Sequence, residues 1–250
     1  MTPKATYPSL VGQTVLMTGG ASGIGAEIVR HFAAQDARVG FVDLDADGAA
    51  AMAEETGATY EVADLRDIPA LKTAFANLIA ALGAPKVLVN NAARDDRHGW
   101  ETVTEEYYDE RIATNLRHMF FATQACAPAM IDAGQGGSIV NMGSNSWWEA
   151  SGGMPVYTTA KSAVHGMTRS FARDLGAHRI RVNTVVPGWI MTDRQKELWV
   201  TEEALSRHLQ NQCTPDPIQP AEVAEMVLFL ASDAASACTA NNFFVEAGSV

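Results

Sequence analysis

The most regular feature of the chain is a series of short runs rich in Val, Ile, Leu and Phe, separated by longer stretches with apolar residues every three or four positions. The short runs are typical of β-strands and the longer stretches of helices. Several runs are apolar almost throughout, as expected for strands covered by helices on both faces. We place seven strands, at 14–17, 39–42, 60–62, 87–89, 138–141, 181–186 and 243–245.

Strands that alternate with helices predict an α/β fold of the doubly wound Rossmann type, with a seven-stranded parallel sheet and helices on both faces. Such a sheet binds ligands at the carboxyl ends of its strands. Apolar periodicity predicts helices over 24–32, 71–82, 164–175 and 223–230. The segment at about 188–220 reads as irregular and follows a strand end, where long insertions commonly form substrate lids. No Pro/Gly/Ser-rich linker divides the chain, so residues 1–250 are expected to form a single domain.

Composition narrows the function classes. A formal net charge of -11 disfavours binding to nucleic acid phosphates and to anionic membranes. No apolar run approaches the roughly 18 to 20 residues that span a bilayer. Three cysteines and a start without a signal-peptide pattern give no sign of a disulfide framework or of export. We therefore expect a cytoplasmic protein with a small-molecule ligand and with neither nucleic-acid nor membrane partners.

A glycine-rich turn lies between the first predicted strand and the first predicted helix. The spacing of Gly19, Gly23 and Gly25 lets the backbone turn tightly and approach a pyrophosphate at the positive end of the helix. Ser22 and Ile24 are expected to donate hydrogen bonds from this turn. The spacing departs from the Gly-x-Gly-x-x-Gly of many dinucleotide folds, so the position between strand and helix carries the prediction of a dinucleotide site.

An acidic residue, Asp43, ends the second predicted strand. A carboxylate there accepts hydrogen bonds from adenosine ribose hydroxyls and repels a 2′-phosphate. No Arg or Lys lies between Asp43 and Glu54 to compensate such a phosphate, so NAD is the expected cofactor. The alternative is that Asp43 only caps a turn. Asp64 and Leu65, after the third strand, are candidates to border the adenine ring, or else to cap a helix.

Three polar residues supply the candidate chemistry. Tyr157 follows Ser144 by thirteen positions and precedes Lys161 by four. If the segment is helical, Tyr157 and Lys161 rise from one face. A tyrosine has an ordinary pKa of about 10, and a neighbouring ammonium favours the phenolate, which predicts a base that works near neutrality. Ser144 is expected to bind the same substrate oxygen.

With these motifs in order, the chain resembles the short-chain dehydrogenase/reductases over essentially its whole length. The resemblance assigns Thr18 through Gly25 to cofactor binding and implies catalytic roles for Ser144, Tyr157 and Lys161. It implies a proton relay through water for Asn115. It further assigns cofactor contacts to the residues Asn91, Pro187, Gly188, Ile190 and Thr192, and it implies a homotetramer.

Finer features resemble bacterial sugar dehydrogenases that oxidise aldopyranoses at C1, with xylose, arabinose, galactose or fucose as substrates. The segments that carry this likeness are 95–98, 109–112, 115–118 and 143–147. They imply a substrate site on loops beyond the strand ends. Its candidates are Asp95, Asp96, Arg97, His98, Ser144, Asn145, Trp147, Trp148, Tyr157 and Trp189, of which Trp147 and Trp148 are equally compatible with lid or core packing.

The predicted reaction is hydride transfer from C1 of a cyclic aldose to NAD, with Tyr157 as the base and an aldonolactone as the product. No metal is expected, because no His/Cys/Asp cluster has metal-ligand spacing. Ala93, in place of the usual glycine, and Arg94 depart from the resemblance near the substrate site. The alternative is a dehydrogenase or reductase of a non-sugar secondary alcohol or ketone, such as a hydroxysteroid or a 3-oxoacyl compound. A protein that senses NAD without turnover has no evident need for the four catalytic candidates Asn115, Ser144, Tyr157 and Lys161 together.

Overall fold

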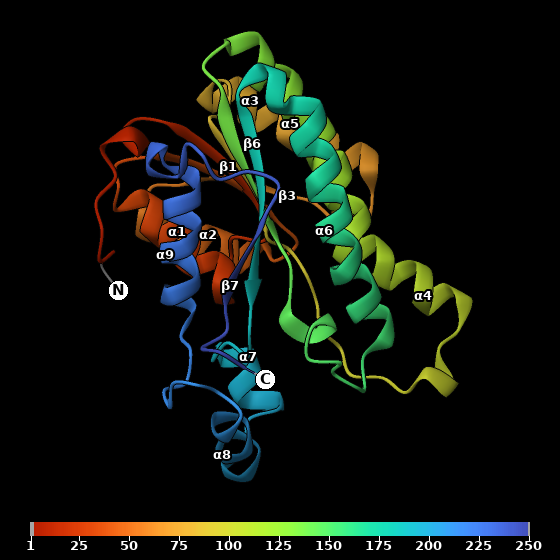
Figure 1. Cartoon of the computed structure of the whole chain (residues 1–250). Coiled ribbons are helices and arrows are strands. Elements are labelled where there is room, and N and C mark those ends of the chain that lie inside the picture. Colours follow the sequence, from red (N-terminus) through yellow and green to blue (C-terminus); the bar gives the residue numbers. More distant parts are fainter. Residues whose placement is uncertain (1–2, 250) are drawn as a thin grey trace.

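The computed structural model describes residues 3–249, which form a sheet of seven parallel strands (Figure 1). The strand order is β3-β2-β1-β4-β5-β6-β7. The strands are β1 Thr14–Thr18, β2 Arg38–Asp43, β3 Thr59–Val62, β4 Val87–Asn90, β5 Gly137–Met142, β6 Ile180–Pro187 and β7 Asn242–Val245. Each predicted strand is present, and the prediction of a doubly wound parallel sheet is confirmed.

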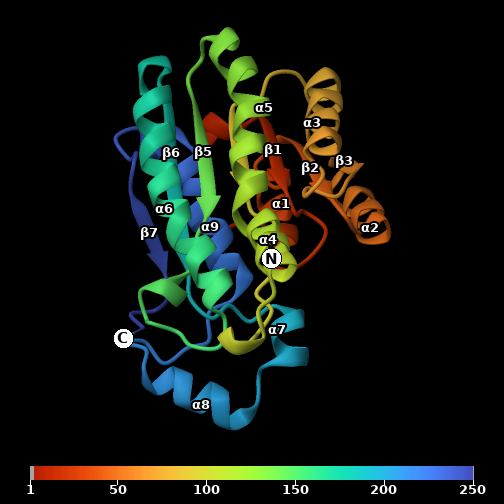
Figure 2. The same cartoon turned by 90° about the vertical axis from the view of Figure 1, so that its right-hand side faces the viewer.

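Helices cover both faces of the sheet (Figures 1 and 2). The helices α1, α2 and α9 pack on one face, and α3, α5 and α6 pack on the other. Over 3–249 the α-helices are α1 Gly23–Ala33, α2 Ala46–Thr56, α3 Ile68–Leu82, α4 Glu105–Ile112, α5 His118–Ala133, α6 Pro155–Leu175, α7 Asp193–Leu198, α8 Glu202–Gln210 and α9 Pro220–Ala231. The four helices predicted from periodicity correspond to α1, α3, α6 and α9.

Apolar side chains between the layers hold the sheet in place. Phe32 of α1 and Phe75 of α3 are fully buried on opposite faces. Cys126 of α5 is also fully buried, and burial raises the pKa of its thiol. Burial of a large apolar side chain such as Phe32 or Phe75 contributes about 1.5 to 3 kcal/mol to the stability of the fold. These buried contacts hold the helices that carry site residues against the sheet.

A buried polar chain crosses the sheet beneath its carboxyl edge. Asn90 of β4 donates to Asn141 Oδ1 of β5 at 2.8 Å, and Asn141 Nδ2 donates to Thr168 Oγ1 of α6 at 2.9 Å. The Thr168 hydroxyl lies 2.8 Å from Thr184 Oγ1 of β6. Because a buried polar group without a partner is costly, this chain fixes α6 against the strands in one register.

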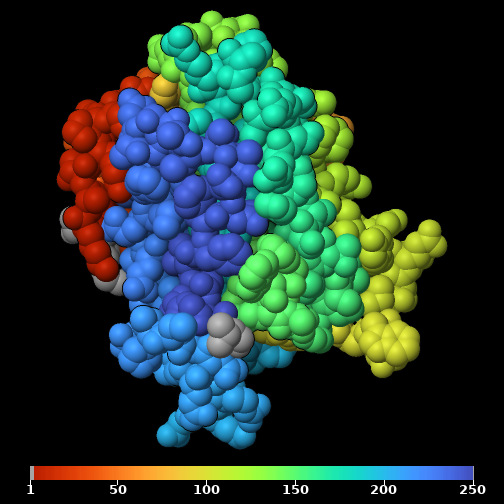
Figure 3. Space-filling model, in the orientation of Figure 1, coloured from red at the N-terminus to blue at the C-terminus, as the bar shows by residue number. Residues whose placement is uncertain are grey.

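The segment at 188–220 differs from its prediction as an irregular stretch, because it contains α7 and α8. Both helices are short, and each begins at a threonine cap: Thr192 accepts from Gln195 N at 3.3 Å, and Thr201 accepts from Ala204 N at 3.1 Å. They lie beyond the carboxyl ends of the strands, and α8 projects from the body (Figures 2 and 3). Among residues 3–249 no helix is long and apolar enough to cross a membrane.

Candidate active site

A cavity of about 610 Å³ opens at the carboxyl edge of the sheet, beside the point where the strand order reverses between β1 and β4. That reversal is the place where doubly wound sheets bind ligands. Most of the predicted cofactor residues line it: Gly19, Ser22, Gly23, Ile24, Gly25, Asp43, Asn91, Tyr157, Lys161, Pro187, Gly188, Ile190 and Thr192. Ser144, Arg97, Asn145 and Trp189 of the predicted substrate residues line it as well.

The turn needs glycine for two reasons: Gly19 and Gly23 have positive φ, and at Gly25 there is no space for a Cβ atom. Gly19 and Gly23 have φ of +73° and +56°, a region that strains other residues. At Gly25 a Cβ atom would lie 1.7 Å from Gly19 O and 2.6 Å from Asn91 Nδ2. That space is taken by a hydrogen bond, since Asn91 Nδ2 donates to Gly19 O at 2.7 Å. The turn is therefore packed directly on the loop that follows β4.

The start of α1 has the properties of an anion site. Ser22, the N-cap residue, forms no side-chain capping bond within the described residues, so the first amides of the helix face the cavity edge without that partner. Asp43 at the end of β2 accepts from Ala21 N at 2.9 Å and from Asp45 N at 3.1 Å. The helix terminus thus suits a pyrophosphate, and the carboxylate beside it suits ribose hydroxyls.

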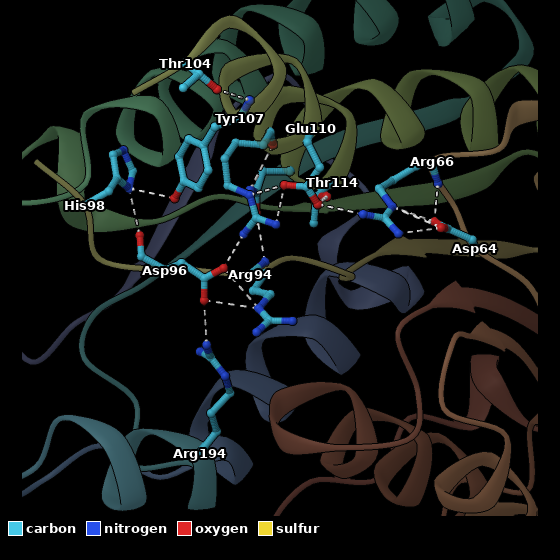
Figure 4. A network of polar contacts seen from close by, with 12 residues as sticks. Asp64, Arg66, Arg94, Asp96, His98, Thr104, Tyr107, Glu110, Thr114 and Arg194 are labelled. Atoms are coloured by element: carbon cyan, nitrogen blue, oxygen red, sulfur yellow. Dashed lines mark hydrogen bonds and ion pairs between the residues drawn. The ribbon is translucent and has the colours of Figure 1, made fainter. Parts of the chain in front are cut away.

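Asp64 and Leu65 do not line this cavity. Asp64 forms an ion pair with Arg66 at 2.6 Å, and this hydrogen-bonded guanidinium lowers the pKa of the carboxyl group. Arg66 also contacts Glu110 at 2.8 Å (Figure 4). Leu65 packs against the core beneath α3. Contact of these two residues with adenine stays a prediction.

The segment after β6 lines the same cavity as the glycine turn, and Thr192 lies beside Gly23. Gly188 N donates to Val245 O at 2.9 Å, and a Cβ at Gly188 would lie 2.9 Å from Glu246 Cα, so this position also needs glycine. Thr192 is fixed as the N-cap of α7. With Pro187 and Ile190, these residues stand where the resemblance assigns the nicotinamide contacts.

The three residues predicted to be catalytic, Ser144, Tyr157 and Lys161, all line the cavity. Tyr157 and Lys161 lie on α6, as predicted, with Lys161 Nζ 5.8 Å from the centroid of the phenol ring. Lys161 is 2% exposed, and its Nζ donates to Met142 O at 2.8 Å. Ser144 follows β5, and its Oγ accepts from Ser146 N at 3.2 Å. A hydroxyl, a phenol and an amine are thereby held on rigid elements around one volume.

Burial dominates the protonation of this group. It lowers the pKa of Lys161 to about 7, against the opposing charge of Asp95. It also raises the pKa of Tyr157, and Asp95 adds to this rise, whereas the hydrogen bond with Ser144 and the charge of Arg97 oppose it. The sequence argument predicted a lowered phenol pKa, and for this structure that direction is wrong. Desolvation of the phenol outweighs the effect of the neighbouring cations.

Asn115 occupies a π-helical turn, Ala113–Arg117, between α4 and α5. It is fully buried, its Nδ2 donates to Arg111 O at 3.0 Å, and its Oδ1 accepts from Arg94 N at 2.8 Å. Asn115 does not line the cavity, and its visible role is to hold the loop after β4 against the helix. The proton relay through Asn115 stays a prediction.

Two histidines near the site serve as hydrogen-bonding supports. His98 Nδ1 lies 2.9 Å from Asp96 O and 3.0 Å from the Tyr107 hydroxyl, and its Nε2 accepts from Val156 N at 3.2 Å. His118 Nε2 lies 2.9 Å from the carbonyl oxygen of residue 92, and burial lowers the pKa of the ring to about 4. His98 lies away from the cavity wall, so substrate contact by His98 stays a prediction.

Adjacent members of the predicted substrate loop have different surroundings. Asp95 and Arg97 line the cavity, whereas Asp96 is not a lining residue and is surrounded by arginines (Figure 4). Asp96 contacts Arg194 at 2.8 Å and Arg94 at 3.1 Å. These ion pairs hold the Asp96 carboxylate, and substrate contact by Asp96 stays a prediction.

Of the predicted substrate residues Trp147 and Trp189, only Trp189 lines the cavity. Trp147 packs edge-on against Trp148 with ring centroids 5.5 Å apart, and it stacks on His165 at 6.4 Å. It does not line the cavity, and packing is its visible role. Trp189 lines the cavity, and its Nε1 donates to Gln195 Oε1 at 2.9 Å.

Several lining residues were not identified from the sequence. They come from the segment after Ser144 and from the two helices that were read as irregular: Glu149, Ser151, Met154, Arg194, Gln195 and His208. Arg194 pairs with Asp95 at 2.7 Å, and Gln195 Nε2 donates to the other Asp95 oxygen at 2.7 Å. The threonine caps at the starts of α7 and α8 were the available signal for these helices.

A glycine turn at the start of α1, an aspartate at the end of β2 and a Ser-Tyr-Lys group around one cavity define a nicotinamide-dependent oxidoreductase. Comparison with known proteins agrees. A family model described as "Enoyl-(Acyl carrier protein) reductase" matches residues 19–249. The chain belongs to the short-chain dehydrogenase/reductase family.

Two relatives match the chain along its full length. A D-xylose 1-dehydrogenase from Caulobacter vibrioides (strain NA1000 / CB15N) is 47% identical over 250 residues, with 98% of each chain covered. A protein described as probable galactose dehydrogenase GalD, from Rhizobium meliloti (strain 1021), is 44% identical over 252 residues, again with 98% of each covered. A solved short-chain type dehydrogenase/reductase from Mycobacterium ulcerans superposes with a TM-score of 0.92 at 28% identity, over 96% of this chain and 90% of that chain.

Proposed function

We propose that this protein oxidises C1 of a cyclic aldose (a pentose, a hexose or a 6-deoxyhexose) with NAD and produces an aldonolactone. The observation that carries the proposal is the polar wall next to the catalytic group. Asp95, Arg97 and Asn145 line the same cavity as Ser144 and Tyr157. A sugar needs many hydrogen-bonding partners, which this wall offers. The names of the full-length relatives, a D-xylose 1-dehydrogenase and a probable galactose dehydrogenase, support the same substrate class.

In this proposal Ser144 and Tyr157 bind the anomeric hydroxyl, and Tyr157 takes its proton as C1 is oxidised. NAD, when bound, accepts the hydride. Only the phenolate form of Tyr157 can take this proton. Because burial raises the pKa of Tyr157, formation of the phenolate depends on the groups that oppose this rise, namely Ser144 and the guanidinium of Arg97. Lys161, which Met142 O orients, adds positive charge whenever it is protonated. Asn115 serves as the first member of a water-mediated route to solvent.

The choice of NAD over NADP rests on Asp43. Its two carboxylate oxygens are oriented by Ala21 N and Asp45 N at the cavity edge. A carboxylate in this position binds ribose hydroxyls and repels a 2′-phosphate. The glycine turn and Asn91 hold the remainder of the dinucleotide, and the residues Pro187 to Thr192 hold its nicotinamide end.

Three further features complete the proposal. The lid follows from the position of α7 and α8, the homotetramer from the family resemblance, and the location from the composition of the sequence. The segment at about 188–220 acts as a substrate lid on a single catalytic domain. The protein works as a homotetramer in the cytoplasm. Light scattering on the purified protein tests the assembly: a mass near four chains is expected, and a monomer would contradict the proposal.

The test of function is the initial rate of NADH formation from NAD with a panel of pentoses, hexoses and 6-deoxyhexoses. We expect a strong rate with one or two aldoses and a fall of about 100- to 10,000-fold in kcat for Tyr157→Phe, with the affinity for NADH unchanged. Absence of turnover with every aldose would reject the aldose proposal. The panel therefore includes a hydroxysteroid and a 3-oxoacyl substrate, whose turnover would identify the alternative.

A further inference from the structure

The lid helix α8 contributes His208 to the cavity wall. Its ring packs edge-on against Trp189, with ring centroids 5.1 Å apart and planes at 87°. Trp189 Nε1 donates to Gln195 Oε1, and Gln195 Nε2 donates to Asp95 Oδ2. All four side chains line the cavity. A continuous set of contacts therefore holds the imidazole in place and reaches from α8 to the loop after β4.

The amide of Gln212 determines which nitrogen of His208 carries the proton. One end of this amide lies 3.2 Å from both Thr214 O and Asp216 O, and only an NH₂ group can donate to two carbonyl oxygens. The amide nitrogen therefore occupies that end, and the amide oxygen faces His208 Nε2 at 3.1 Å. His208 Nε2 accordingly carries the hydrogen, which makes Nδ1 the unprotonated acceptor of the neutral ring.

Nδ1 of His208 has no hydrogen-bond partner within residues 3–249. Burial lowers the pKa of this ring, which keeps the imidazole neutral at pH 7. A neutral acceptor such as Nδ1 of His208, next to the Trp189 indole, is suited to a ligand hydroxyl group, which can donate a hydrogen bond to it. It is poorly suited to an anion, because a lone pair repels negative charge. The catalytic group has no use for this acceptor, since Ser144 and Tyr157 already account for the reacting oxygen.

We propose that His208 is a specificity-determining residue: its Nδ1 accepts a hydrogen bond from a sugar hydroxyl remote from C1, and Trp189 covers the neighbouring C–H surface of the sugar. This inference rests on the proposed aldose oxidation. It assigns His208 to sugar binding and gives it no part in proton transfer at C1.

Three substitutions separate the acceptor from the rest of the ring. His208→Asn places an amide where Nδ1 stands and keeps the acceptor, whereas His208→Gln reaches the position of Nε2. His208→Leu removes both nitrogens at similar size. For the best aldose of the panel we expect His208→Leu and His208→Gln to raise KM for the sugar about 10-fold or more, with kcat within about 3-fold and KM for NAD unchanged. His208→Asn should return KM to within about 3-fold of the original protein.

A matched control is His178→Leu, an exposed histidine on the short helix after α6 and outside the cavity lining, which should leave all constants unchanged. Single-deoxy sugars then identify the hydroxyl. For the analogue that lacks the partner of Nδ1, KM should rise in the original protein and His208→Leu should cause no further loss.

Each outcome decides the matter. Equal sugar KM values in the original protein, His208→Leu and His208→Asn would overturn the inference and leave aldose oxidation intact, as would a loss confined to kcat. Failure of the original protein to oxidise any aldose would overturn both the proposed function and the inference. If His208→Leu unfolds, as a thermal melt would reveal, the comparison of His208→Asn with His208→Gln carries the test: similar KM values in these two would overturn the inference.

Discussion

The buried amine of Lys161 makes the stability of the protein depend on pH in a defined direction. Its pKa in the folded protein is about 7, below the ordinary value of 10.5. Between these values the unfolded chain binds one more proton than the folded protein, so the free energy of unfolding rises with pH across this window. Below pH 7 both states are protonated at Lys161, and this contribution to the pH dependence ends. Lys161→Met removes the titrating group and keeps most of the buried volume.

The size of the effect follows from the shift. One pKa unit corresponds to about 1.4 kcal/mol, so the whole window represents about 5 kcal/mol of penalty on the folded, charged form. Over the accessible range from pH 7 to 8.5 the gain in unfolding free energy is about 2 kcal/mol. For a chain of this length that gain raises the midpoint of thermal unfolding by about 4 to 8 °C.

The assay is thermal and urea unfolding of both proteins at intervals from pH 6.5 to 8.5, without cofactor. The range stops there because burial raises the pKa values of Cys126 and Tyr157, which affect stability at higher pH. Groups common to both proteins cancel in the difference. Lys161→Met should lose the hydrogen bond to Met142 O, which shifts its curve without changing the slope. Parallel curves for the two proteins would refute the reasoning, because they would show that Lys161 keeps an ordinary pKa.

Three other substitutions test the cavity wall. Gly25→Ala forces a Cβ against Gly19 O. We expect the free energy of unfolding to fall by about 1 to 3 kcal/mol, measured by thermal melting, and the affinity for NADH to fall about 10-fold or more, measured by fluorescence titration. Asp43→Asn keeps only one of the two oxygens that accept from Ala21 N and Asp45 N, and it loses the charge, so kcat/KM for NADP relative to NAD should rise about 10-fold or more. Arg194→Met removes the ion pairs of Arg194 with Asp95 and Asp96 and leaves the Gln195 bond to Asp95, so KM for the sugar should rise about 3- to 10-fold. Because these pairs are partly exposed, the melting midpoint should change little.

The fold was predictable because its signals are local. The apolar runs that became β1, β4 and β5 are buried throughout, and such runs leave little choice other than strands between two helical layers. The placement of Tyr157 and Lys161 was predictable for a similar reason, since a spacing of four on a helix fixes their common face. The helices α7 and α8 were not predicted, because each is short and carries few apolar side chains.

The direction of the Tyr157 pKa shift could not be obtained from the sequence. The motif shows a phenol and an amine four residues apart, which predicts mutual stabilisation of their charged forms. The structure adds a quantity that the motif lacks, the depth of burial, and burial favours the neutral form of both groups. A residue spacing indicates which groups meet, whereas the surrounding volume determines how strongly each one holds its proton.

The substrate loop shows the same limit in its geometry. The run of Asp95, Asp96 and Arg97 reads as one polar cluster, yet Asp95 and Arg97 line the cavity, whereas Asp96 does not and pairs with Arg194. Asp96 pairs with Arg94 and Arg194 and so connects the loop to α7, while Asp95 pairs with Arg194 and lines the same cavity as Tyr157 and Lys161. Consecutive residues of this loop therefore have different roles: Asp96 holds the loop in place through its ion pairs, and Asp95 and Arg97 line the cavity. The path of the loop after β4 is fixed by two hydrogen bonds to other elements, from Arg94 N to Asn115 Oδ1 and from Asn91 Nδ2 to Gly19 O, and a sequence motif does not show such contacts.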